Sequence, residues 1–86
     1  NRRNEYMATK QNLINWVELA LGELGGRGSI VQVAEIIWRE HRKELEASGN
    51  LFFTWQYDMR WAATTLRKAG RIKSKDMSPK GIWELT

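Results

Sequence analysis

The sequence predicts a small α+β domain in which three helices precede a short antiparallel β-sheet. Apolar residues recur at helical spacing over three segments between residues 10 and 69, and the residues after them alternate as short strands do. The chain has 86 residues, 42% of them hydrophobic, which is enough for one domain with its own core. It has no cysteine and one histidine, which excludes a disulfide scaffold, a thiol nucleophile and a Cys/His zinc site.

The first helix is predicted over residues 10–24. Thr9 stands at the position of an N-cap, and Gly25 and Gly26 supply the left-handed residues that end helices. Its apolar stripe has a period near 3.6 residues, with Trp16 at its edge, and consists of Leu13, Val17, Ala20, Leu21 and Leu24.

The second helix is predicted over residues 32–46. One broad side carries Val33, Ala34, Ile37, Trp38, His41 and Leu45, and the other carries Arg39, Arg42 and Lys43. The β-prone residues 29–31 before it would add a third strand to the sheet, and residues 51–53 after it would form an apolar connection into the core. Because the chain has no second His or Cys, His41 is expected to be a core or boundary residue and not a metal ligand.

The third helix is predicted over residues 54–69, with Thr54 as its cap and Gly70 as its end. Its apolar side carries Trp55, Met59, Ala62, Leu66 and Ala69, and its polar side carries Gln56, Arg60, Thr64 and Arg67. Residues 71–73 and 81–86 are predicted strands, joined by a polar turn that contains Pro79.

This order of elements is that of the winged helix-turn-helix, with a two- or three-stranded antiparallel sheet as the wing. Residues 9–86 would form the winged-helix domain, and residues 1–8 a flexible N-terminal arm in which Arg2 and Arg3 add positive charge. Since residue 1 is Asn and not Met, we expect the chain to be an excerpt of a longer protein or a processed or tagged form.

Residues 61–86 also resemble the N-terminal domain of Mrr-type restriction proteins. In that family a Trp-Ala pair opens the back half of the third helix, Lys-Ala-Gly ends it, and a Gly-aliphatic-Trp strand follows the wing. The matching residues are Trp61, Ala62, Leu66, Lys68, Ala69, Gly70, Ile72, Gly81, Ile82, Trp83 and Thr86. Residues 10–60 match only in pattern. The resemblance implies a DNA-specificity module of a restriction or modification-dependent endonuclease system.

Positive charge is concentrated at the C-terminal end. Residues 1–53 carry seven basic and seven acidic side chains, whereas residues 54–86 carry seven basic and three acidic ones, so the net charge of +4 lies in the last third. Such asymmetry is typical of a face that binds a polyanion. In the major groove, Gln56 and Arg60 would read bases and Arg67 would anchor the backbone. In the wing, Arg71 and the lysines Lys73, Lys75 and Lys80 would meet phosphates or a minor groove. The candidate DNA-binding residues are Gln56, Tyr57, Arg60, Thr64, Arg67, Lys68, Arg71, Lys73, Lys75 and Lys80.

No catalytic site is predicted. Residues 25–29 lack the spacing of a phosphate-binding loop, the serines have only His41 as a possible base, and Asp58, Asp76 and Glu84 are scattered among basic residues. We therefore expect a binding module without cofactor or metal, with any nuclease activity in a fused or partner domain. The apolar runs are shorter than the roughly 20 residues of a membrane span, so a cytoplasmic, nucleoid-associated protein is expected.

Two other functions fit the same sequence. A winged helix can mediate protein association, in which case Trp38, Phe52 or Phe53 would form an exposed patch. A small transcriptional regulator would share the DNA chemistry and would form a homodimer. Five tryptophans are expected mostly in the core, with Trp38 and Trp61 at its rim, where an indole can also stack on a base.

Overall fold

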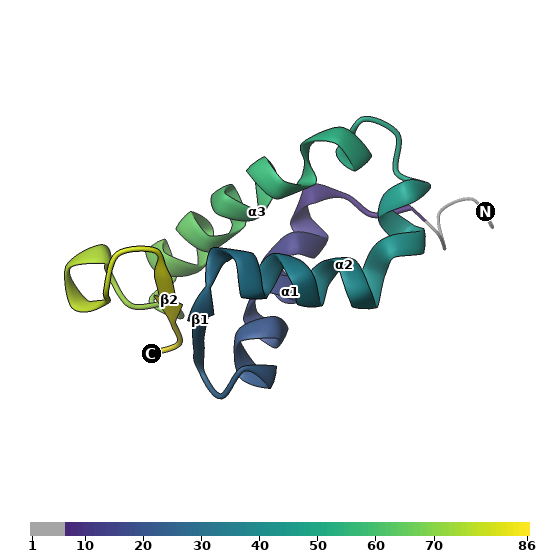
Figure 1. Cartoon of the computed structure of the whole chain (residues 1–86). Coiled ribbons are helices and arrows are strands. Elements are labelled where there is room, and N and C mark those ends of the chain that lie inside the picture. The colour runs from purple at the N-terminus through teal and green to yellow at the C-terminus, as the bar shows by residue number, and fades with distance from the viewer. Residues whose placement is uncertain (1–6) are drawn as a thin grey trace.

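The computed structural model describes residues 7–86 and contains three α-helices and a two-stranded antiparallel sheet (Figure 1). The elements are helix α1 (Lys10–Glu23), strand β1 (Arg27–Ser29), helix α2 (Ile30–Glu46), helix α3 (Leu51–Lys68), the 3₁₀-helix η2 (Lys75–Met77) and strand β2 (Ile82–Glu84). The predicted α+β class is confirmed. Arg2 and Arg3 of the predicted arm lie outside the described residues.

Helix α1 forms as its sequence indicates. The backbone N–H of Thr9 donates to Asn12 Oδ1 at 2.9 Å, which satisfies a donor at the start of the helix. Gly25 and Gly26 follow the helix with φ values of +85° and +102°, a region that favours glycine. The helix therefore ends at Glu23, one residue before the predicted end.

Helix α2 begins two residues earlier than predicted, because Ser29 caps it. The Gln32 N–H donates to Ser29 Oγ at 3.1 Å, and the Ser29 N–H donates to Gln32 Oε1 at 2.9 Å, a capping box. Ile30 and Val31 are consequently helical. The prediction of a strand over residues 29–31 is confirmed for Ser29, which pairs with Ile82, and was wrong for Ile30 and Val31; the strand is Arg27–Ser29.

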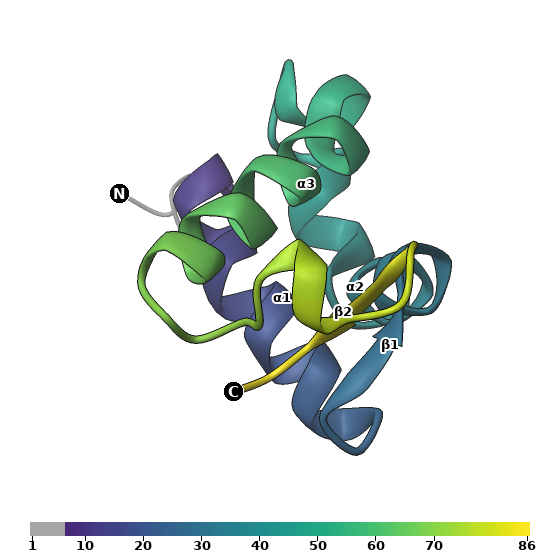
Figure 2. The same cartoon turned by 90° about the vertical axis from the view of Figure 1, so that its left-hand side faces the viewer.

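The sheet pairs β1 with β2 (Figure 2). Within it, Gly28 lies opposite Trp83. Residues 71–73 do not form a full strand; they contribute one bridge, between Ile72 and Leu85. Gly28 is buried, and a Cβ atom added there would lie 2.5 Å from Leu24 Cδ1. This glycine therefore permits close packing between the end of α1 and the sheet.

Helix α3 begins at Leu51, three residues before the predicted start. Residues 51–53 form its first turn, and Phe53 is 82% exposed, so the prediction that this segment fills the core was wrong for Phe53. Thr54 lies inside the helix, where its hydroxyl donates to Asp58 Oδ2 at 2.8 Å. Ala69, predicted to be buried, follows the last helical residue and is exposed.

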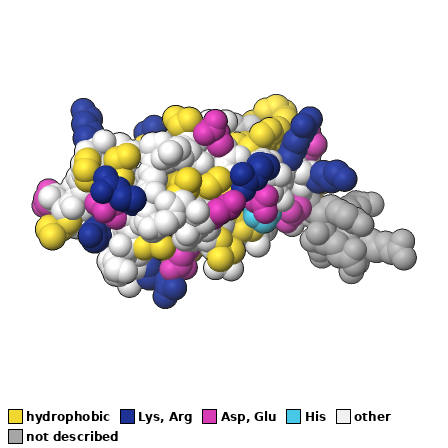
Figure 3. All heavy atoms as spheres, turned by 60° about the horizontal axis from the view of Figure 1, so that its bottom comes forward, with side chains coloured by type: hydrophobic (Ala, Val, Ile, Leu, Met, Phe, Trp, Pro, Cys, Tyr) yellow, Lys and Arg dark blue, Asp and Glu magenta, His cyan; other side chains and the backbone are white. Residues whose placement is uncertain are grey.

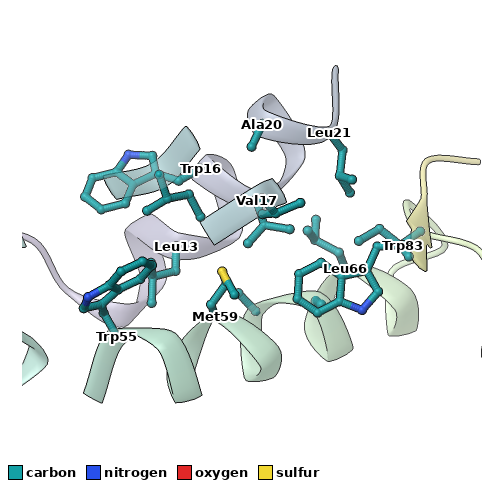
Figure 4. Close-up of a cluster of buried hydrophobic side chains, with 14 of the residues drawn as sticks. Leu13, Trp16, Val17, Ala20, Leu21, Trp55, Met59, Leu66 and Trp83 are labelled. Atoms are coloured by element: carbon teal, nitrogen blue, oxygen red, sulfur yellow. The ribbon is translucent and has the colours of Figure 1, made fainter. Parts of the chain in front are cut away.

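The core lies mainly between α1 and α3, with Trp83 of β2 closing it at the sheet (Figure 4). His41 packs at the edge of the core, its ring stacked on Trp16 with 3.7 Å between centroids, as the sequence predicted. Trp16, Trp55 and Trp83 are buried, and Trp38 and Trp61 are half-buried at the rim.

The start of the described chain is tied to the loop between α2 and α3. Ala8 is buried, and its N–H donates to Ser48 Oγ at 2.7 Å. The Ser48 hydroxyl in turn donates to the Glu44 carbonyl. Residue 8, which was predicted to belong to a flexible arm, is therefore part of the folded domain.

Candidate nucleic-acid interface

The exposed side of α3 carries a line of polar and basic residues, which we call the α3 ridge: Gln56, Tyr57, Arg60, Thr64 and Lys68. Four of them follow one another at steps of four residues, so they lie on one side of the helix. Arg60 and Lys68 form no ion pair within residues 7–86. The Thr64 hydroxyl donates to the Arg60 carbonyl at 3.1 Å, so this short side chain lies close to the helix.

Two depressions flank the α3 ridge. The larger, which we call the α2/α3 groove, has a volume of about 780 Å³ and is lined by Ile30, Val31, Ala34, Glu35, Trp38, Phe52, Trp55, Gln56, Tyr57, Met59 and Arg60. The smaller, which we call the α1/α3 hollow, has a volume of about 320 Å³ and is lined by Lys10, Tyr57, Asp58, Arg60, Trp61 and Thr64. Because Tyr57 and Arg60 border both, the ridge stands between two recesses.

The α2/α3 groove is aromatic. The rings of Trp38 and Trp55 are nearly parallel, 6.0 Å apart between centroids, and Phe52 lies 6.4 Å from Trp38. Tyr57 on its rim is 77% exposed, and the neighbouring Phe53 is 82% exposed. Of the three residues that the sequence associates with protein binding, Phe53 is exposed, and Trp38 and Phe52 are half-buried in the groove.

Three of the candidate DNA-binding residues make internal contacts near the sheet. Arg71 forms an ion pair with Glu18 of α1, and Lys73 Nζ lies 3.9 Å from Glu84 Oε2. Arg67 Nε donates to the backbone carbonyl of Lys73 at 3.2 Å. These contacts hold the segment after α3 against α1 and β2.

Two lysines between α3 and β2 are free of such contacts. Lys75 and Lys80 are exposed and form no ion pair within the described chain. The predicted set thus divides into two groups. One makes no side-chain hydrogen bond or ion pair to another element within the described chain, namely Gln56, Tyr57, Arg60, Thr64, Lys68, Lys75 and Lys80, and the other makes such internal contacts, namely Arg67, Arg71 and Lys73.

The outer face of α2 is largely neutralised. Arg39 donates to Glu23 at 2.6 Å and to Glu40 at 3.1 Å, and these hydrogen bonds, above all the one that Glu23 accepts, raise the pKa of Arg39 above its usual value. Arg42 pairs with Glu46 at 3.4 Å. Acidic and basic side chains are likewise interspersed over the face shown in Figure 3.

Sequence reasoning missed two residues beside the ridge, Lys10 and Asp58. Lys10 Nζ lies 4.5 Å from the ring centroid of Trp61. The sequence placed Lys10 only at the start of the first helix, and no local signal indicates that this start meets the middle of α3. That proximity is set by the packing of α1 on α3.

No protein-family model matches this chain, and comparisons with curated proteins and with solved structures gave no match. Over residues 7–86, no group of three or more Asp, Glu and His side chains is arranged to hold a metal ion. None of the helices in this part of the chain is long and apolar enough to cross a membrane. The function is therefore inferred from the geometry and charge of the α3 ridge and its surroundings.

Proposed function

We propose that the domain is a winged helix-turn-helix that binds double-stranded DNA, with α3 in the major groove and the segment between α3 and β2 on the backbone. The observation that carries this proposal is the α3 ridge. It stands between two recesses, it carries no acidic residue, and its two cations have no carboxylate partner within the described chain. An α-helix fits the major groove, where Gln and Arg form paired hydrogen bonds with adenine and guanine.

The ridge and the wing have different roles in this proposal. Gln56 and Arg60, in the N-terminal half of α3, read base edges. Lys68, Lys75 and Lys80 neutralise phosphates, which fixes the position of the domain without reading sequence. Arg67 and Arg71 make internal contacts that stabilise the fold around the segment after α3, and the proposal assigns neither of them a DNA contact.

The likeness of residues 61–86 to Mrr-type restriction proteins supports a place in a restriction or modification-dependent endonuclease system. The domain then supplies specificity and contains no catalytic site, and a fused or partner domain cuts the DNA. Such a module acts in the cytoplasm, at the nucleoid.

A salt titration tests the proposal. Lys68, Lys75 and Lys80 alone, as three phosphate contacts, give a slope of about −2.7 for log K against log salt concentration, and each further phosphate contact steepens it by about 0.9. The domain would be titrated with a random duplex pool, with and without base methylation, at about 50 to 200 mM salt. Binding that is insensitive to salt, or absent at the lowest salt, would overturn the proposal.

Protein association is the second candidate, and the α2/α3 groove favours it. A partner seated there would cover Gln56 and Arg60, which line the groove, so the two functions would compete for one face. Phe53 beside the groove is 82% exposed. A small dimeric transcriptional regulator is the third reading, and sedimentation of the domain alone and with duplex DNA separates it from a monomeric module.

A further inference from the structure

We propose that the α1/α3 hollow is a phosphate subsite of the DNA interface, in which Lys10 binds a backbone phosphate beside the base pairs that α3 reads. This inference rests on the proposed function. It adds a contact from α1, an element that the sequence assigns to the core alone, and it places one edge of the DNA footprint at the start of that helix.

The ammonium group of the exposed Lys10 contacts the ring of Trp61. Its ammonium group lies 4.5 Å from the ring centroid of Trp61, a half-buried residue packed against the core. A cation over the face of an indole is attracted by the ring quadrupole, which restrains an otherwise flexible lysine. The hollow is continuous with the α3 ridge, because Tyr57 and Arg60 line it as well. Lys10 is thus held one helix away from the base-reading residues.

The charges around the hollow favour an anion. Neither Lys10 nor Arg60 forms an ion pair among residues 7–86. The one acidic residue that lines the hollow is Asp58, whose Oδ2 accepts a hydrogen bond from the Thr54 hydroxyl at 2.8 Å. Two cations therefore face one carboxylate. At the sheet, by contrast, Arg71 and Lys73 are already paired with Glu18 and Glu84.

A DNA phosphate fits this hollow better than an isolated anion does. When a helix occupies the major groove, a phosphate backbone passes on either side of it, and contacts to that backbone fix the register of the protein. In this arrangement, the wing lysines contact the backbone near the end of α3, and Lys10 contacts the backbone beside the middle of α3. Lysine binds phosphate as a point charge and needs no second partner of fixed geometry.

The test compares four variants on matched duplexes. At 0.1 M salt, loss of one phosphate contact weakens binding by about eightfold and reduces the steepness of the salt slope by about 0.9. K10Q should show both effects on every duplex, whatever its sequence, whereas K10R should bind like the wild type. D58N, which keeps an acceptor for Thr54, should bind every duplex more tightly. K43Q is the matched control, because Lys43 is exposed and unpaired on α2, and it should change nothing.

The outcomes separate this inference from the proposed function. If the wild type binds duplex DNA and K10Q binds it with the same affinity and salt slope, the phosphate subsite is overturned and DNA binding by α3 is left intact. A change in discrimination between sequences in K10Q would assign Lys10 to base reading and would also overturn it. No duplex binding by the wild type would overturn both. Competition by inorganic phosphate at millimolar concentration would indicate a free-anion site instead. If K10Q fails to fold by circular dichroism, weaker or unchanged binding by D58N decides against the proposal.

Discussion

Replacing Arg67 by alanine should destabilise the fold and leave DNA recognition largely unchanged. The side chain is half-buried, and its Nε donates to the Lys73 carbonyl at 3.2 Å, which joins the end of α3 to the segment leading to the sheet. A hydrogen bond from a charged donor contributes about 1.5–3 kcal/mol, and partial exposure reduces this to about 1 kcal/mol. With an unfolding entropy of about 2.1 cal/mol/K per residue, an 86-residue domain loses about 5 to 6 °C of Tm per kcal/mol.

Thermal melts by circular dichroism and duplex titrations at 25 °C measure the two effects separately. Arg67→Ala should lower Tm by about 6 °C and change duplex affinity by less than about twofold, well under the effect of a lost phosphate contact. Arg60→Ala is the matched control, because Arg60 is exposed and makes no ion pair within residues 7–86, so its Tm should not change. An unchanged Tm for Arg67→Ala together with uniformly weaker DNA binding would refute this reasoning and make Arg67 a phosphate anchor.

Three further variants test other parts of the structure. Ser48→Ala leaves the buried Ala8 N–H without its acceptor and should cost about 1–3 kcal/mol of unfolding free energy, measured by urea denaturation; an unchanged midpoint would show that the bond is not formed in solution. Lys75→Ala combined with Lys80→Ala should weaken binding to all duplexes alike and flatten the salt slope by about 1.8, and a loss of discrimination between sequences would contradict their assignment to phosphates. Phe53→Ser should alter stability by less than about 0.5 kcal/mol, because the ring is 82% exposed. If the same change abolishes capture of a protein partner, association through the α2/α3 groove gains support over DNA binding.

The sequence predicts a helix correctly where the spacing of its apolar residues and the capping residues at its ends indicate the same segment. In α1, the apolar stripe, Thr9 and the glycine pair all point to the same segment, and the helix differs from the prediction by one residue. For α2 and α3, the apolar spacing places the first helical residue later in the chain than the structure does. The Ser29–Gln32 capping box overrides the β propensity of Ile30 and Val31, because it satisfies backbone donors that a short strand would leave open.

In the candidate site, too, some features could be predicted from the sequence and others could not. Spacing along one helix is a local property, so the α3 ridge could be predicted from Gln56, Arg60 and Thr64 alone. Contacts between distant segments could not. The partner of Arg71 is Glu18, 53 residues away, and Lys10 meets Trp61 only because α1 packs on α3. The net charge of residues 54–86 thus overstates the number of cations that are free to bind DNA. The zero net charge of residues 1–53 gives no sign that Lys10 is one of them.

The central claim, that α3 reads duplex DNA, is tested most directly by the ratio of affinities for a preferred and a scrambled duplex, measured for wild type and Arg60→Ala. The preferred duplex comes from selection on a random pool. A bidentate contact from Arg to guanine contributes about 1–3 kcal/mol of discrimination, so the ratio should fall by about 5- to 150-fold while affinity for the scrambled duplex changes little. If Arg60→Ala leaves the ratio unchanged, α3 does not read the DNA, and the claim is contradicted.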